Sequence, residues 1–358
     1  MNNASENLND VKEDIQERDR YLTLTEVDPS NKQFLYHLGN IYVKLNNLTD
    51  AMESYNKILQ LDKNYKEAYK GIGNVCLSQK KNMESIENFQ KALEIDPKYK
   101  EAHVAVGLAY TNLNKYDDAI RSYNKALECD ANYRDAYYRL GLIYKTTTDY
   151  KLALENLDKA LDLDPKFQDA FIAKGNIYIS LEQYEKAVHI FLDTIKINPK
   201  NVEAYINLGI SYERQGKYKE SIECNKKVFE FDPNNKEALL HIGFALDNLG
   251  RQKKAIEIYS EILEIDPKNI DALINIGISL DKLGKYDEAC QKYSLVLEID
   301  PNYKLAYNNL GNSLIHNMKF EESIVKFNKA LEIDPNYSTA KLNKERAIKI
   351  FEVYKKYS

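Results

Sequence analysis

The apolar residues of this chain recur with the spacing of amphipathic helices. Between successive proline-containing segments lie two stretches in which apolar residues fall at i, i+3, i+4 and i+7. No stretch alternates with the period of two that a half-buried strand requires. The pattern therefore predicts an all-α protein built from pairs of helices.

The pattern repeats every 34 residues. An acidic residue followed by proline recurs in one phase, at Asp28-Pro29, Asp96-Pro97, Asp164-Pro165, Asp232-Pro233, Asp266-Pro267, Asp300-Pro301 and Asp334-Pro335. A glycine recurs in a second phase, at Gly39, Gly73, Gly107, Gly141, Gly175, Gly209, Gly243, Gly277 and Gly311. A small residue follows each glycine after twelve positions, as Ala51, Ser85, Ala119, Ala153, Ala187, Ser221, Ala255, Ala289 and Ser323. Each 34-residue repeat is therefore expected to be one helical hairpin.

Local chemistry predicts where the two helices of each hairpin end. Proline lacks an amide donor and disfavours helix in the residue before it, so the Asp-Pro pair ends the second helix. A second set of residues lies where the first helix would end in a left-handed C-cap: Gly216, Gly250, Gly284, Asn46 and Asn114.

The phase-locked glycines lie inside helices, where each costs about 1 kcal/mol relative to alanine. Close approach of the partner helix is the expected compensation. We expect Ala51 to face Gly39 and Ala119 to face Gly107, so that two backbones cross tightly.

These features resemble the tetratricopeptide repeat (TPR) family, whose repeat has a bulky residue, Leu-Gly, Tyr, a small residue, an aromatic residue, a second small residue and proline. The stretch 134–167 shows the pattern as Tyr137, Leu140, Gly141, Tyr144, Ala153, Leu157, Ala160 and Pro165. The resemblance covers repeats 1 to 9, at residues 32–65, 66–99, 100–133, 134–167, 168–201, 202–235, 236–269, 270–303 and 304–337. It implies an α-solenoid of stacked antiparallel helix pairs, the TPR right-handed superhelix, because a lone hairpin buries too little apolar area to stand alone.

Two substitutions depart from the family pattern. Asn225 replaces an expected aromatic residue in repeat 6, and Lys174 replaces an expected leucine in repeat 5. Looser packing is expected in both repeats.

The two ends of the chain differ from the repeats, as capping segments should. Residues 1–10 are polar and are expected to be disordered, and residues 11–31 are expected to form a half-repeat cap helix. Residues 338–358 predict a C-terminal capping helix with one apolar stripe of Leu342, Ile348, Phe351 and Tyr354.

Composition and charge narrow the function. The 358 residues carry 50 Lys+Arg against 55 Asp+Glu, a net charge of -5, which argues against a nucleic-acid binder that works by charge. No stretch approaches the ~18 apolar residues of a membrane span, and the start lacks a signal-peptide pattern, so we expect a cytoplasmic protein without membrane attachment. The cysteines form no C-x-x-C pair and are expected to be reduced, buried thiols rather than disulfides or zinc ligands: Cys76, Cys129, Cys224 and Cys290.

No catalytic motif stands out. The five histidines lie more than four residues apart and have no obvious partner, and no P-loop, G-x-S-x-G or EF-hand sequence occurs. The repeats use most of the chain, so we expect no enzyme activity, no cofactor and no metal.

Function then depends on the surface of the repeats. Positions 2, 6, 9 and 13 of each first helix fall on one stripe, which the family geometry places on the concave face. Position 6 and one further position in the later repeats give Asn207, His241, Asn275, Asn309 and Asn312. One turn before the first three lie the carboxylates Glu203, Glu237 and Asp271.

A ladder of amides can bind an extended peptide backbone through donors and acceptors. It resembles the asparagine ladder in the repeat arm of O-linked N-acetylglucosamine transferase, which binds polypeptide substrates. The alternative is that Asn at position 6 merely follows the average composition of the family.

A second candidate surface lies in the earlier repeats. Lys70, Asn74 and Arg139 resemble part of the carboxylate clamp with which chaperone cofactors hold an acidic C-terminal tail. The match is incomplete, because Ala105 stands where the clamp has Asn and Asp135 where it has Lys. The solvated face of a helix explains these residues equally well.

The sequence thus predicts a non-catalytic scaffold that binds a protein or peptide partner in a concave groove. One alternative is a substrate-recruiting arm of a separately encoded enzyme such as a glycosyltransferase. The other is a self-associating structural protein that forms a homodimer through the cap helix at 338–358.

Overall fold

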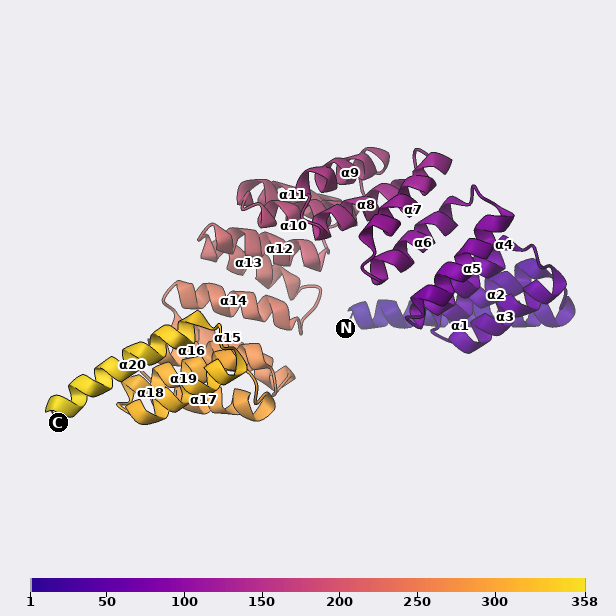
Figure 1. Cartoon of the computed structure of the whole chain (residues 1–358). Coiled ribbons are helices and arrows are strands. Elements are labelled where there is room, and N and C mark those ends of the chain that lie inside the picture. The colour runs from indigo at the N-terminus through magenta and orange to yellow at the C-terminus, as the bar shows by residue number, and fades with distance from the viewer. Residues whose placement is uncertain (1, 358) are drawn as a thin grey trace. The chain divides into compact units, whose positions relative to one another are not determined.

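The computed structural model describes the backbone of residues 2–357 and the side chains of residues 11–356. Within these residues the protein consists of twenty helices and contains no strand. Helix α1 (Asn2–Val27) precedes nine helix pairs, and α20 (Ser338–Tyr357) follows them (Figure 1). The predicted fold class, an all-α solenoid of stacked antiparallel helix pairs, is confirmed.

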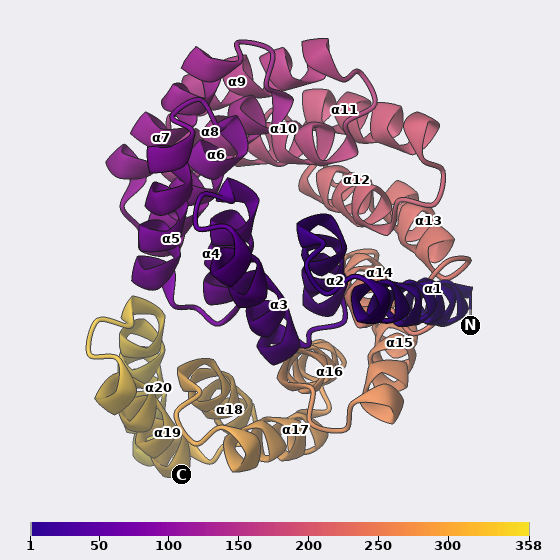
Figure 2. The same cartoon turned by 90° about the vertical axis from the view of Figure 1, so that its right-hand side faces the viewer.

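The first helices of the pairs are α2 (Lys32–Lys44), α4 (Lys66–Ser78), α6 (Lys100–Asn112), α8 (Arg134–Thr146), α10 (Gln168–Ser180), α12 (Val202–Arg214), α14 (Lys236–Asn248), α16 (Ile270–Lys282) and α18 (Lys304–His316). The second helices are α3 (Leu48–Leu61), α5 (Asn82–Ile95), α7 (Tyr116–Cys129), α9 (Tyr150–Leu163), α11 (Tyr184–Ile197), α13 (Tyr218–Val228), α15 (Gln252–Ile265), α17 (Tyr286–Ile299) and α19 (Phe320–Ile333). The chain divides into an N-terminal half, residues 1–181, and a C-terminal half, residues 182–358. In the C-terminal half, α12, α14, α16 and α18 follow the inner side of a curve and their second helices follow the outer side (Figure 2).

The second residue after each first helix has a positive φ in all nine repeats. The predicted C-caps at Gly216, Gly250, Gly284, Asn46 and Asn114 are confirmed, with φ between 57° and 74°. The same phase also holds residues that the sequence did not single out, namely Lys80, Thr148, Glu182 and Met318. The backbone turn is therefore a property of the repeat, and glycine only makes it less strained.

Most glycines inside the first helices make room for an aromatic ring of the second helix. A Cβ atom on Gly39 would lie 2.6 Å from Cε1 of Tyr55, and one on Gly107 would lie 2.5 Å from Cε1 of Tyr123. The group nearest to Gly39 is thus the ring of Tyr55, while the expected neighbour Ala51 is fully buried. The glycine avoids an overlap with the ring that fills the hairpin, sixteen residues along the chain.

In six repeats an ion pair joins the first residue of the first helix to the aspartate that follows the second helix. A lysine or arginine at position 1 binds the aspartate thirty residues later, with N···O distances of 2.6 to 2.9 Å, in the pairs Lys32–Asp62, Lys66–Asp96, Lys100–Asp130, Arg134–Asp164, Lys236–Asp266 and Lys304–Asp334. The hydrogen bond from Lys66 holds the pKa of the Asp96 carboxyl below its ordinary value. The aspartate that the sequence predicts as a helix stop thus also links the start of its repeat to the end.

The N-terminal helix α1 packs against α2. The ring of Tyr21 stacks on His37 with 5.1 Å between centroids. Helix α1 includes most of the segment 1–10 for which the polar sequence predicts disorder. The side chains of residues 1–10 lie outside the described part of the chain, so that expectation stays a prediction.

The C-terminal helix α20 packs against α18 and α19. Ala340 and Ala347 are fully buried, and the ring of Phe351 lies 5.7 Å from the ring of Phe320. Leu342 is 67% exposed. Its predicted place in the stripe is therefore wrong, because the small side chains Ala340 and Ala347 mark the face of α20 that contacts the stack.

Among the described helices, none combines the length and apolar character that crossing a bilayer demands.

Candidate functional site

Three first helices of the C-terminal half form one wall. Helix α14 packs between α12 and α16, and α18 continues the row beside α16. A pocket of about 650 Å³ lies on this wall, and it is lined by Ile210, Glu213, Arg214, Tyr218, Leu240, His241, Phe244, Asp271 and Asn275. Most of these residues occupy positions 2, 6, 9 or 13 of their repeats, which are the positions of the predicted stripe.

The apolar part of the pocket centres on Phe244 at position 9 of α14. Its side chain is 46% exposed, although most large apolar residues of this helix are buried. The ring of Tyr218 meets it edge-on with 6.4 Å between centroids. An exposed phenylalanine in a pocket offers an anchoring surface for an apolar group. The predicted stripe contains position 9, but the site residues predicted at that position are asparagines and not Phe244.

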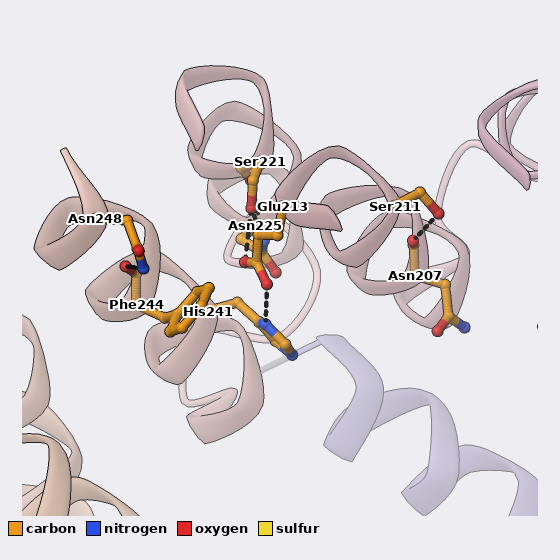
Figure 3. Close-up of polar contacts among 8 residues, drawn as sticks. All are labelled: Asn207, Ser211, Glu213, Ser221, Asn225, His241, Phe244 and Asn248. Atoms are coloured by element: carbon orange, nitrogen blue, oxygen red, sulfur yellow. Dashed lines mark hydrogen bonds and ion pairs between the residues drawn. The ribbon is translucent and has the colours of Figure 1, made fainter. Parts of the chain in front are cut away.

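The polar part of the pocket is held by a buried carboxylate. The side chain of Glu213 is 7% exposed and accepts two hydrogen bonds, from Ser221 Oγ to Oε1 at 2.9 Å and from His241 Nδ1 to Oε2 at 3.1 Å (Figure 3). Because a carboxylate only accepts, Nδ1 of His241 carries the proton in this contact. The other ring nitrogen, Nε2, points away from Glu213 (Figure 3).

The expectation that no histidine has an obvious partner is therefore wrong for His241. Glu213 precedes it by 28 residues and belongs to the previous repeat. The contact forms only when repeats 6 and 7 stack, so no local pattern in the sequence indicates it.

Repeat 6 has an irregular second helix beneath this network. Asn225 is fully buried where other repeats have an aromatic residue or leucine, and its Nδ2 donates to the carbonyl of Ser221 at 3.0 Å. Its Oδ1 has no hydrogen-bond partner among the described residues. Helix α13 contains 11 residues, whereas the other second helices contain 14.

Carboxylates at position 12 of repeats 6, 7 and 8 link four successive repeats of the C-terminal half. Glu213 binds His241 of the next repeat, as described above. Asp247 and Asp281 take the same position in repeats 7 and 8. Asp247 accepts from Ser279 at 3.1 Å, and Asp281 accepts from Ser313 at 2.6 Å. The signal that could have found them is the recurrence of an acid at a position that holds Val, Leu or Ile in repeats 1, 2, 5 and 9.

Burial raises the pKa of Asp281 above its ordinary value. The phenol of Tyr293 donates to the same carboxylate at 2.8 Å. The three acids at position 12, Glu213, Asp247 and Asp281, are therefore buried or half-buried and fix the spacing of the first helices.

The structure brings together only part of the predicted asparagine ladder. His241 and Asn275 line the pocket, whereas Asn207, Asn309 and Asn312 are not among the lining residues. The carbonyl of Asn207 accepts from Ser211 Oγ at 2.8 Å, and the amide oxygen of Asn309 accepts from Asn308 at 3.3 Å. The three remaining asparagines are half-buried on α12 and α18.

The candidate surface of the earlier repeats does not converge. Lys70 and Asn74 lie on α4, and Arg139 lies on α8; α6 contacts both helices, but α4 and α8 do not contact each other in the part of the chain that the structure describes. The Lys70 ammonium lies over the ring of Tyr99 at 5.7 Å, and the Arg139 guanidinium lies over the ring of Tyr138 at 5.8 Å. These cations pack on aromatic rings of their own surface instead of forming one clamp.

The comparisons with known proteins cover most of the repeats. Residues 39–79, 73–114, 107–147, 175–216 and 280–315 match a family described as TPR repeat, and together they span more than half of the chain. Families described as tetratricopeptide repeat match residues 202–235 and 305–337, residues 135–167 and 236–269, and residues 258–291. No curated protein matches the chain.

Solved structures share this fold at low sequence identity. A tetratricopeptide repeat protein from Parabacteroides merdae is 16% identical with a TM-score of 0.54, over 70% of this chain and 98% of that chain. The Cut9–Hcn1 hetero-tetramer of the APC/C is 14% identical with a TM-score of 0.53, over 88% and 76%. The pilF protein of Pseudomonas aeruginosa is 18% identical with a TM-score of 0.50, over 58% and 94%. At these identities the likeness concerns the fold alone.

Proposed function

Because the chain belongs to the tetratricopeptide repeat family, we propose that it is a non-catalytic protein–protein interaction scaffold that binds an extended peptide segment of its partner. The pocket on α12, α14 and α16 is the observation that supports this proposal. It combines an exposed aromatic ring, Phe244, with polar groups that are fixed in position, His241 above all. An apolar anchor with a few oriented polar groups is the usual make-up of a specific binding pocket.

Peptide selection tests the proposal directly. The full chain is immobilised and used to select peptides of about twelve residues from an unbiased display library, and the affinities of the selected peptides are then measured by fluorescence anisotropy. Phe244→Ser is expected to weaken binding at least tenfold, which corresponds to about 1.4 kcal/mol. A matched control is Leu295→Ser on α17, where the leucine is 41% exposed and does not line the pocket.

Equal affinities for the Phe244→Ser and Leu295→Ser variants would contradict groove binding. Circular dichroism of each variant shows whether the helices are intact. A recruiting arm of a separately encoded enzyme would use the same groove, and its distinguishing prediction is an enzyme activity that co-purifies with the chain.

Self-association is a second candidate, supported by the outer face of α20. Leu342 and Val353 are 67% and 55% exposed on this last helix. A homodimer through α20 would cover them. Light scattering over a concentration series is then expected to show a rising mass that the Leu342→Glu, Val353→Glu double variant abolishes. A constant monomer mass for the unmodified chain would exclude this homodimer.

A further inference from the structure

The groove of the C-terminal half carries carboxylates that its own repeats do not neutralise. Glu203, Glu237 and Asp271 occupy position 2 of α12, α14 and α16, so they recur once per helix along the wall. All three are exposed, and none forms an ion pair with a described side chain. The aspartates at the ends of six repeats differ from them, because each of those has a lysine or arginine partner within its own repeat.

The pocket at this wall favours an amphipathic cation. Ile210, Leu240 and Phe244 provide apolar surface for an aliphatic stem, and long basic side chains commonly bury such a stem while the charged head reaches polar groups. The carboxylate of Asp271 lines the same pocket and can accept from the head group. An ammonium or guanidinium above the exposed ring of Phe244 gains a further cation–π attraction.

The pocket contains a second acidic side chain. Glu213 lines it together with Asp271, and Glu213 Oε2 lies 3.1 Å from His241 Nδ1. A ligand that donates hydrogen bonds matches these acidic side chains, whereas a ligand carboxylate would meet further oxygen acceptors. Arg214 is the one cation among the lining residues, against the two anions Glu213 and Asp271.

We propose that the peptide bound in this groove is a basic, extended segment that places one lysine or arginine side chain in the pocket. The inference rests on the proposed function and specifies its partner. Adjacent packed helices lie about 10 Å apart, and an extended chain advances about 3.3 Å per residue. A basic side chain at every third residue therefore meets the carboxylates at position 2 of successive helices.

Synthetic peptides of defined charge test this assignment. The probe is a fluorescein-labelled peptide of four Lys-Ser-Leu triplets, and its charge-reversed counterpart has four Glu-Ser-Leu triplets. We expect the lysine peptide to bind the full chain and the glutamate peptide to bind at least tenfold more weakly. Equal binding of the two peptides, or tighter binding of the glutamate peptide, would overturn the proposal.

A pair of matched triple variants locates the binding. Glu203→Gln, Glu237→Gln and Asp271→Asn together are expected to weaken the lysine peptide at least tenfold. The control combines Glu220→Gln, Glu257→Gln and Glu298→Gln, which removes the same charge from exposed positions on the second helices α13, α15 and α17. The control is expected to bind within twofold of the unmodified chain. Equal losses in both triples would overturn the proposal, because the attraction would then follow net charge alone.

Arg214→Gln provides a test of opposite sign. It removes a like charge from the pocket, so the lysine peptide should bind more tightly, and weaker binding would contradict the inference.

The Phe244→Ser variant separates this inference from the proposed function. Display-selected peptides that depend on Phe244 but lack basic residues would refute the charge assignment and leave groove binding intact. If no peptide of either charge responds to Phe244→Ser, groove binding itself fails.

Discussion

His241 Nδ1 lies 3.1 Å from Oε2 of Glu213, and this hydrogen bond joins two neighbouring repeats in the wall formed by α12, α14 and α16. The other carboxylate oxygen of Glu213 accepts from Ser221 at 2.9 Å. One buried acid therefore binds a side chain of the pocket and a residue of the second helix α13 at the same time. The orientation of His241 depends on how repeats 6 and 7 stack.

Removal of this acid should destabilise the stack. Glu213→Ala leaves His241 and Ser221 without their acceptor in a buried site, and an unsatisfied buried group costs about 1 to 3 kcal/mol. Glu213→Gln keeps an acceptor oxygen of the same reach and should cost less. Urea denaturation followed by circular dichroism measures both variants, and equal midpoints for the two would show that the hydrogen bonds are unimportant.

Asn225→Phe should stabilise repeat 6. The substitution removes an unpaired buried Oδ1 and provides the aromatic ring that Phe89 gives at the same position of repeat 2. Gain of a buried ring and loss of an unsatisfied acceptor are expected to contribute about 1 to 2 kcal/mol. A raised urea midpoint is the expected outcome. A lowered midpoint would mean that the polar contact with Ser221 is worth more than the ring.

The effect of Gly311→Ala on stability should change sign when the ring of Phe327 is removed. A Cβ on Gly311 would lie 2.7 Å from Cε1 of Phe327, so Gly311→Ala alone should destabilise by about 1 to 3 kcal/mol through overpacking. In a Phe327→Ala background the overlap is gone. The same change should then stabilise by up to about 1 kcal/mol, the difference in helix propensity. A double-mutant cycle of thermal midpoints gives both values, and an unchanged sign would refute the assignment of the ring as the reason for glycine.

The ion pairs at the repeat ends should make stability fall in acid. Hydrogen bonds to lysine hold the pKa of Asp62, Asp96 and Asp130 below the ordinary value in the folded protein. For an acid with a lowered folded pKa, the contribution is present above the unfolded pKa of about 3.9 and is lost as pH falls through the folded pKa. Replacing these three aspartates by asparagine should flatten the acid limb of the stability curve.

The control for the pH experiment replaces exposed carboxylates that form no ion pair with described side chains, namely Glu87, Glu94 and Glu155. Their replacement by glutamine changes the net charge equally but removes no ion pair. Urea midpoints between about pH 2.5 and 7 compare the two triples. Identical acid limbs would show that net charge, rather than the pairs, governs the acid sensitivity.

The sequence by itself determined the helices, because their limits depend on local chemistry. Proline cannot donate its amide, and glycine accepts a positive φ, so the ends of the helices could be predicted at Asp96-Pro97 and Gly250. The 34-residue period determined the family and the stripe of positions that contains Phe244 and Asn275. These are properties of residues close in the chain, and they persist wherever the repeat occurs.

Only the tertiary structure decided which of these residues meet. Lys80 has a positive φ of 61° without being glycine, because the hairpin imposes the turn on it. The ring of Tyr55 is the group that a Cβ on Gly39 would overlap, and Glu213 reaches His241 from the preceding repeat. Such contacts depend on distances across packed helices, which a one-dimensional period does not contain. For the same reason the pocket joins His241 and Asn275 but leaves Asn207 and Asn309 outside, although all four share one position of the repeat.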